Sequence, residues 1–409
     1  MIHDRLIVCL ASAWDYDPTS KHHLMRILSR RNHVLWINYH GTRRPAPTRS
    51  DLRDAFSAVV RVARGLRRVT PTMTQLTPLV IPGANGTALE RLHRRLLTAQ
   101  IRRAIRKINP AGDKPVQVWT FAPDLPFLKG ALGEECFVYY CVDEYTRFKG
   151  FDAAAIKAAE DELLVRADLV VTTSEPLLVT KRIRRPDAIL IPHGVDYDHF
   201  AAAWRSPQPR PHDLAAINAP IFGFFGLIHH WIDRALIARV ARLRPDYAFV
   251  LIGDCKSDIA KLRNLANVYL IGRRPYATLP AYCSAFNAGL LPFVQNTMTR
   301  SINPIKMMEY LAAGLPVIST PLPAAERFLG PVAIAASADD FAIACDAALA
   351  PQNADRQRIS LTVRDHTWES RINILSELVS RAAQRSVPQV PANSAVSRLV
   401  RGASQVALP

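Results

Sequence analysis

The chain has 409 residues, of which 49% are hydrophobic, so it is long enough for two domains that each bury a core. Its six cysteines lack CxxC pairs and metal-ligand spacing, which argues against a disulfide scaffold or a cysteine-ligated metal. The net charge of +17 is concentrated in residues 1–110, where 20 Lys and Arg face 6 Asp and Glu.

The first half of the chain alternates short β-rich runs with helical patterns, which predicts a parallel sheet with helices on both faces. The expected strands cover residues 6–11, 33–39, 76–81, 116–121, 137–142 and 169–173. The expected helices cover residues 21–31, 88–108, 153–166 and 177–183. We assign residues 1–204 to this N-terminal Rossmann-like domain.

Two carboxylates follow the expected strand at 137–142. Asp143 and Glu144 would lie at the carboxyl end of that strand, where ligands bind in open α/β sheets. Asp143 is our candidate for a general base and Glu144 is its rival, while an N-cap or an ion pair with Arg147 is the structural alternative. The loop and helix after the first strand offer three further candidates, Asp15, His22 and His23.

Basic residues gather in two stretches of the first domain. One stretch contains Arg43, Arg44, Arg49, Arg53, Arg61, Arg64, Arg67 and Arg68. On the helix expected at 88–108, basic residues alternate with Leu and Ile, as in an amphipathic basic helix. This positive charge could bind an anionic partner, which could be anionic lipid, a diphosphate-linked substrate or nucleic acid. The structural alternative is a basic face that is only solvated. Because no nucleic-acid-binding motif is present, we expect an anionic membrane surface as partner.

The proline-rich segment 205–214 separates the two halves, and we interpret it as an interdomain linker. The second half repeats the alternating pattern, with strands expected at 221–227, 248–252, 268–271, 289–292 and 317–319. We assign residues 215–385 to a C-terminal Rossmann-like domain, whose last helix could return to the N-terminal domain. Residues 386–409, rich in Pro, Ser, Ala and Val, are expected to be disordered.

A helix expected at 304–313 carries the most informative pattern. Asn303 suits its N-cap, Pro304 its first position and Gly314 its left-handed C-cap. Lys306 in the first turn opposes the helix dipole, a conflict that a bound anion would remove. Glu309 would lie on the same face and could accept hydrogen bonds from ribose hydroxyls. An exposed Lys306–Glu309 ion pair, worth a few tenths of a kcal/mol, is the structural alternative.

Other residues of the second half could complete a phosphate- and nucleotide-binding site. They follow the carboxyl ends of expected strands or precede the helix at 304–313, and no aspartate pair of metal-binding type is evident. These candidates are Gly226, His229, His230, Gly272, Arg273, Arg274 and Arg300.

Three motifs occur in the order and spacing found in bacterial GT-B glycosyltransferases, which the chain resembles over about residues 5–385. They are Ile191–Phe200, Ile221–Gly226 and Asn303–Thr320. The resemblance implies two facing Rossmann-like domains with a central cleft, a nucleotide-sugar substrate, no cofactor and no metal. Retaining family 4 enzymes have a second Glu where this chain has Ser301, so the pattern is nearer to GumK-like glucuronosyltransferases and teichuronic-acid-type transferases. That likeness slightly favours inversion over retention, with an N-domain aspartate, for which Asp143 is our candidate, as base and Lys306 at the diphosphate.

The resemblance implies transfer of a hexose or hexuronate from a nucleotide sugar, with UDP favoured, to a lipid-linked or polysaccharide acceptor of cell-surface glycan synthesis. No apolar run reaches the roughly 20 residues that span a bilayer, and the N-terminus lacks a signal peptide's pattern. We therefore expect a cytoplasmic protein, peripheral at the inner face of the membrane. Another sugar-nucleotide enzyme on the same fold, or a non-enzymatic basic protein that binds membrane or nucleic acid, is the alternative.

Overall fold

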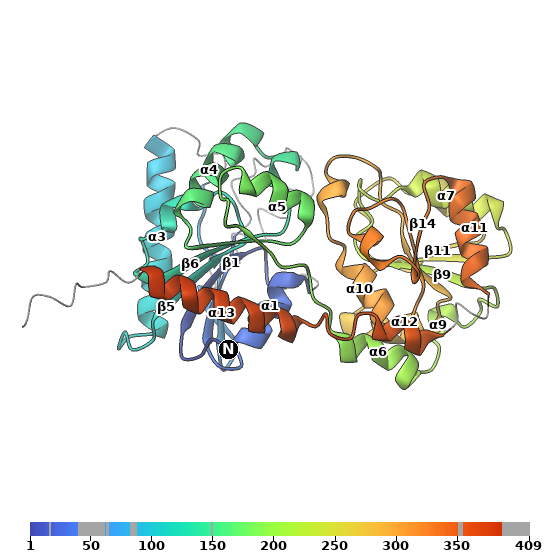
Figure 1. Cartoon of the computed structure of the whole chain (residues 1–409), viewed down its shortest axis with the longest axis horizontal. Coiled ribbons are helices and arrows are strands. Elements are labelled where there is room, and N and C mark those ends of the chain that lie inside the picture. The colour runs from blue at the N-terminus through green and yellow to red at the C-terminus, as the bar shows by residue number, and fades with distance from the viewer. Residues whose placement is uncertain are drawn as a thin grey trace, which may run out of the picture.

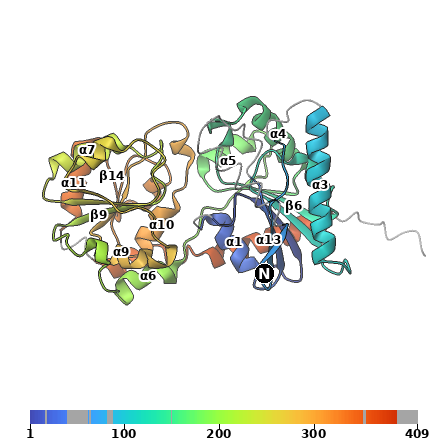
Figure 2. The same cartoon turned by 180° about the vertical axis from the view of Figure 1, so that it is seen from behind.

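The computed structural model describes residues 1–15, 18–39, 62, 65–81, 88–148, 150–350 and 355–386. Figure 1 shows two α/β domains side by side, and Figure 2 shows the same arrangement from behind. Part of the predicted basic cluster and the predicted tail from residue 387 onward lie outside the described residues. The arginines concerned are Arg43, Arg44, Arg49, Arg53, Arg61 and Arg64.

The described N-terminal domain is built on one sheet in the order β3-β4-β2-β1-β5-β6-β7-β8. All neighbouring strands are parallel except β3, which runs antiparallel to β4. The strands are β1 (Leu6–Ala11), β2 (His33–Asn38), β3 (Leu66–Thr70), β4 (Met73–Leu76), β5 (Val116–Thr120), β6 (Glu134–Cys141), β7 (Leu169–Thr172) and β8 (Ile189–Leu190). The strand order reverses at β1. The strands that come next in the chain, β2 to β4, lie on one side of β1, and the later strands, from β5 onward, lie on its other side.

The strand predicted at 76–81 is wrong, because β4 already ends at Leu76. Pro78 follows, and proline has no N–H to donate to the neighbouring strand. The N–H groups of Leu79 and Ile81 instead donate to Gln100 Oε1 and His93 Nδ1 at 2.9 and 3.1 Å. The chain after β4 is thus tied to a helix rather than to the sheet.

Helices cover both faces of the N-terminal sheet. One face packs against α3 (Ala88–Ile108), α4 (Ala153–Arg166) and α5 (Glu175–Arg182), which contribute Leu97, Leu163 and Leu177 to the core. The other face packs against α1 (Ser20–Leu28) and α13 (Trp368–Ser386). The bounds of α3 and α4 agree with the sequence-based prediction.

The described C-terminal domain has a fully parallel sheet in the order β11-β10-β9-β12-β13-β14. The strands are β9 (Ile221–Phe225), β10 (Ala248–Ile252), β11 (Val268–Leu270), β12 (Ala288–Leu291), β13 (Val317–Ser319) and β14 (Val332–Ile334). The helices are α6 (Tyr197–Arg205), α7 (Arg234–Leu243), α8 (Ala260–Arg263), α9 (Leu279–Ala285), α10 (Ile305–Ala312), α11 (Ala338–Ala348) and α12 (Arg356–Leu361).

The boundary between the domains lies earlier than the predicted linker at 205–214. Helix α6 already belongs to the C-terminal core, where Phe200 is fully buried. The chain therefore first crosses between the domains at residues 191–196. It returns before α13, which lies along the N-terminal domain and buries Trp368 and Ile372 there (Figure 1). Apolar burial, rather than proline content, sets the boundary.

Candidate functional site

The side chain of Lys306 lies across the turn that follows β9. A Cβ atom added to Gly226 would lie 2.0 Å from Lys306 Cε and 2.8 Å from Lys306 Nζ. Gly226 also has φ +136°, a conformation that favours glycine. A Cβ on Gly253, in the turn after β10, would lie 1.9 Å from the Gly226 carbonyl oxygen. The two turns and the lysine are thus packed together at the carboxyl ends of neighbouring strands.

The N-terminus of α10 has no side-chain cap, and its N-cap residue is Pro304. The prediction that Asn303 caps this helix is wrong, because Asn303 Nδ2 donates to the carbonyl oxygen of Thr173 in the N-terminal domain, 3.0 Å away. The first-turn N–H groups are therefore not used by a capping side chain. With Lys306 beside them, they form a site suited to an anion.

Glu309 lies one turn further along α10 and is only 5% exposed. Burial raises the pKa of its carboxyl group to about 7, although the Lys306 ammonium acts in the opposite direction. Among the described residues no hydrogen bond or ion pair reaches this carboxylate, so the exposed Lys306–Glu309 pair is not formed. Buried polar groups are usually hydrogen-bonded, so the Glu309 carboxylate is suited to accept hydrogen bonds from a ligand.

Tyr276, which sequence reasoning missed, lies close to Glu309 at the junction of the domains. Its ring stacks on His199 at 4.7 Å and faces His23 of the N-terminal domain at 5.7 Å. The carboxylate of Glu309 contributes, after burial, to raising the pKa of Tyr276. The only local signal for this residue was its place in the loop after β11.

The other C-terminal candidates divide into two groups. His229 and His230 follow Gly226 in the same loop, where Trp231 stacks on His229 at 4.4 Å. Gly272 has φ +76° after β11, and both Arg273 and Arg300 are exposed. Arg274 is instead bound within the domain, because it donates to Asp213 Oδ2 at 2.7 Å and to the Tyr282 hydroxyl at 2.9 Å. This arginine therefore stabilises the fold and is a poor phosphate ligand.

Asp143 lies half-buried after β6, as its position in the sequence predicts. Burial raises the pKa of its carboxyl group, and the nearby ammonium of Lys21 partly offsets that rise. Glu144 has a structural role, since Lys181 Nζ donates to it at 2.8 Å and Thr146 Oγ1 at 2.6 Å. Burial opposes ionisation of Glu144, but these hydrogen bonds prevail and lower its pKa. Asp143 remains the better candidate base.

The candidates from the first loop and helix are engaged in packing or in a surface ion pair. His22 is 1% exposed and accepts a hydrogen bond from the Thr19 N–H at 3.1 Å. His23 stacks on Trp368 at 5.1 Å. Burial lowers the pKa of each histidine to about 3, so both imidazoles are very weak bases, and both are packed in the interior, which does not suit a general base. Asp15 forms an exposed ion pair with Arg67 at 3.1 Å.

Residues 219–350 match the family model described as Glycosyl transferases group 1. The chain is 28% identical over 258 residues to TuaH of Bacillus subtilis strain 168, a protein assigned to teichuronic acid biosynthesis as a glycosyltransferase. That match covers 58% of this chain and 64% of TuaH, so the chain spans less than two thirds of this curated relative.

Solved structures match almost the whole chain. Sucrose-phosphate synthase from Thermosynechococcus elongatus gives a TM-score of 0.63 at 15% identity, over 93% of this chain and 100% of that chain. A UDP-forming α,α-trehalose-phosphate synthase from Burkholderia xenovorans gives 0.63 at 12% identity, over 93% and 99%. The chain has the GT-B fold. The GT-B fold predicted from the sequence is thereby confirmed.

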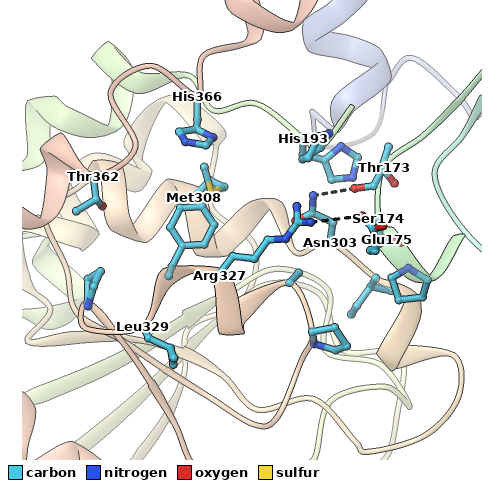
Figure 3. Close-up of a pocket in the computed structure, with 17 residues that line it drawn as sticks. Thr173, Ser174, Glu175, His193, Asn303, Met308, Arg327, Leu329, Thr362 and His366 are labelled. Carbon is cyan, nitrogen blue, oxygen red and sulfur yellow. Dashed lines mark hydrogen bonds and ion pairs between the residues drawn. The ribbon is translucent and has the colours of Figure 1, made fainter. Parts of the chain in front are cut away.

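The junction of the two GT-B domains encloses a cavity of about 450 Å³ (Figure 3). Contacts between the domains border it: Ser174 Oγ donates to the Ser301 carbonyl oxygen at 2.6 Å, and Arg327 pairs with Glu175 at 3.4 Å. Met308 of α10 lines this cavity, whereas Lys306 and Glu309 do not. Residues 306 and 308 lie roughly 200° apart around a helix, so α10 presents different faces to the cavity and to the anion site.

Two further properties concern metals and membranes. Within the described ranges, no group of three or more His, Cys, Asp or Glu side chains is placed to hold a metal ion. None of the described helices combines the length and apolar character needed to cross a bilayer. That the GT-B protein needs no metal or cofactor stays a prediction.

Proposed function

We propose that the protein is a glycosyltransferase that moves a hexose or hexuronate from a nucleotide sugar to an acceptor bound by its N-terminal domain. The observation that carries this proposal is the packing of Lys306, at the uncapped start of α10, against Gly226. The group 1 match over residues 219–350 includes both residues, and the relative TuaH supports a role in cell-wall glycan synthesis.

The donor diphosphate would lie on the first turn of α10. As the bond between the sugar and the diphosphate breaks, negative charge grows on the leaving oxygen, and Lys306 with the N–H groups at the uncapped start of α10 stabilises it. Because a protein cation supplies this charge, we propose a reaction without a metal. Glu309 would accept hydrogen bonds from the ribose hydroxyls, which gives its buried carboxylate the donors that it lacks among the described residues.

Asp143 would activate the acceptor. Its carboxylate takes the proton from an acceptor hydroxyl while the hydroxyl oxygen bonds to the anomeric carbon and the diphosphate leaves from the opposite side. This single displacement inverts the configuration of the anomeric carbon. The raised pKa of Asp143 moves it toward neutral pH, where a general base is most effective.

We propose UDP as the nucleotide, since the Burkholderia enzyme with the same fold is UDP-forming. For the acceptor we propose a lipid-linked or polysaccharide glycan, reached at the cytoplasmic face of an anionic membrane. Helix α3 supports that location, because Arg94, Arg95, Arg102 and Arg106 line a groove of about 420 Å³ on it. Figures 1 and 2 place α3 on the side of the N-terminal domain that faces away from the C-terminal domain.

Calorimetric titration of the full chain with UDP and with GDP tests the proposal. We expect micromolar binding of UDP, weakened about ten-fold or more by Lys306→Ala, because a charge-assisted contact to phosphate contributes more than about 1.4 kcal/mol. Lys261→Ala, an exposed lysine on α8, is the matched control and should bind as the wild type does. Equal UDP affinity in both variants, or no nucleotide binding by the wild type, would contradict the proposal.

A further inference from the structure

We propose that a clasp of three residues at the junction of the domains holds the proposed base at a fixed place relative to the anion site of α10. The three residues are Thr173, Ser174 and Asn303. The inference rests on the proposed function and deepens it, because it assigns these residues a positioning role in the same reaction. Their hydrogen bonds connect the end of β6 with the start of α10.

The N-terminal part of the clasp lies beside Asp143. Strands β6 and β7 are parallel neighbours, and Cys141 is paired with Thr172 near their carboxyl ends, so the residues that follow leave the sheet side by side. Thr173 is fully buried, and its Oγ1 donates to the carbonyl oxygen of Val142 at 3.3 Å. Because Val142 directly precedes Asp143, this bond holds the backbone from which the proposed base extends.

Two hydrogen bonds cross from this turn to the C-terminal domain. Asn303 Nδ2 donates to the carbonyl oxygen of Thr173 at 3.0 Å, as Figure 3 shows. Ser174 Oγ donates to the carbonyl oxygen of Ser301 at 2.6 Å. Ser174 is only 5% exposed and also caps α5, since it accepts from the N–H of Leu177 at 3.5 Å. Consecutive residues of one domain are thus bonded to residues 301 and 303 of the other.

The C-terminal part of the clasp ends directly before the anion site. Asn303 is followed by Pro304, the N-cap of α10, and then by the first turn, which carries Lys306. The proline ring fixes φ, which limits movement of the chain between Asn303 and the helix. The place of the first turn of α10, and of a diphosphate bound there, therefore depends on the place of Asn303.

The proposed displacement depends on the distance between the base and the departing diphosphate. Asp143 belongs to one domain and Lys306 to the other, so contacts within a single domain do not set that distance. A misplacement of about 1 Å can lower a reaction rate about 100-fold. The clasp joins the two domains next to both groups through buried hydrogen bonds, so it is suited to set the distance.

Other contacts cross the junction at the surface. Arg147 donates to Thr297 Oγ1 at 2.9 Å in an exposed hydrogen bond. Arg327 pairs with Glu175 at 3.4 Å, and their side chains are 54% and 52% exposed. Exposed ion pairs contribute little because solvent screens them. Arg327→Ala removes a contact across the same junction without touching the clasp, so it is the matched control.

Turnover by the full chain tests the clasp, with UDP-glucose, UDP-N-acetylglucosamine and UDP-glucuronic acid as donors and bacterial membrane lipids as acceptor. We expect Asn303→Ala to lower kcat about ten-fold or more and to leave the affinity for UDP within about two-fold, because the anion site itself is intact. Arg327→Ala should keep kcat within about two-fold. Urea unfolding identifies a variant that does not fold, and Ser174→Ala, with the same expected effect on kcat, then replaces Asn303→Ala.

A double-variant experiment separates positioning from a merely structural role. In the Asp143→Asn background the base is absent, so Asn303→Ala should change the residual rate less than about two-fold. If Asn303 only held the domains together, its substitution would lower the rate by the same factor with and without the base.

Unchanged kcat in Asn303→Ala and Ser174→Ala, a parallel loss of UDP affinity, or an equal loss of rate in both backgrounds would overturn this inference alone. A wild type that turns over none of the three donors would contradict the proposed function and, with it, the inference. The wild-type measurement therefore distinguishes the two failures.

Discussion

Lys306 covers Gly226 so closely that an added Cβ would lie 2.0 Å from the lysine's Cε. Alanine at position 226 must therefore displace the lysine from the turn after β9, and it also strains a backbone with φ +136°. We expect Gly226→Ala to weaken UDP binding about ten-fold or more, as measured by calorimetry. Gly330→Ala is the control, because Gly330 has φ +108° but nothing within 4 Å of its added Cβ. Equal effects of the two substitutions would show that strain, not the lysine, matters.

The buried carboxyl of Glu309 predicts a pH-dependent stability. Burial raises its pKa from 4.5 to about 7, so the folded chain holds a proton that the unfolded chain releases between these values. Stability from this group is full below about pH 4.5 and is lost as pH rises through about 7, at a cost of about 3 kcal/mol. Glu309→Gln lacks this loss. In urea unfolding, the free energy of unfolding of the variant should rise relative to that of the wild type between pH 4.5 and 8. A difference between the two that does not change with pH would contradict the prediction.

Asp143→Asn should separate chemistry from binding. Asparagine cannot take the acceptor proton, so we expect transfer to fall by about 10²–10⁴-fold while UDP affinity stays within about two-fold. The measurement is transfer of labelled sugar from UDP-sugar to bacterial membrane lipids. Glu144→Gln tests the rival carboxylate and should retain transfer, since Glu144 is bound by Lys181. Wild-type turnover by Asp143→Asn would remove this residue from the mechanism.

The features that sequence could predict are those set by neighbouring residues. Alternating β and helical patterns indicated two parallel sheets, and the helix dipole argument singled out Lys306, which the structure places across Gly226. Asp143 follows the carboxyl end of β6, as predicted, because the end of an apolar run indicates where a buried strand ends. In each case the deciding residues lie within one element or beside it.

The features that sequence could not predict depend on residues far apart in the chain. Asn303 looks like a helix cap, yet its amide binds Thr173, 130 residues away. Arg274 looks like a phosphate ligand until Asp213 is found beside it. His23 stacks on Trp368, which reaches it because α13 returns to the N-terminal domain. A local sequence pattern does not show which distant residues a side chain contacts in the folded protein.

Lys181 lies between two carboxylates, and its Nζ contacts both Glu144 and Glu160 at 2.8 Å. The side chains of Lys181 and Glu160 are at most 6% exposed. Lys181→Met would leave Glu144 and Glu160 without their cation, so we expect a loss of about 3–5 kcal/mol in the free energy of unfolding. Lys157→Met removes the exposed pair with Asp161 and should cost less than about 1 kcal/mol. Similar urea midpoints for the two variants would contradict this role.

The arginines of α3 predict a salt-sensitive attachment to anionic lipid. Arg95 and Arg106 are exposed in the groove, whereas Arg94 lies 5.3 Å over the Phe127 ring and Arg102 donates to the Ala131 carbonyl oxygen at 2.7 Å. Each basic residue near an anionic surface contributes about 1 kcal/mol.

The double variant Arg95→Glu/Arg106→Glu should therefore lose at least ten-fold in co-sedimentation with phosphatidylglycerol vesicles at low salt. Arg239→Glu/Arg242→Glu on α7 reverses two exposed charges in the other domain and should bind as the wild type does. Salt at 0.5 M should also weaken vesicle binding, because attraction between exposed charges is screened within about a Debye length. Binding that changes neither with the α3 substitutions nor with 0.5 M salt would show that this basic surface is only solvated.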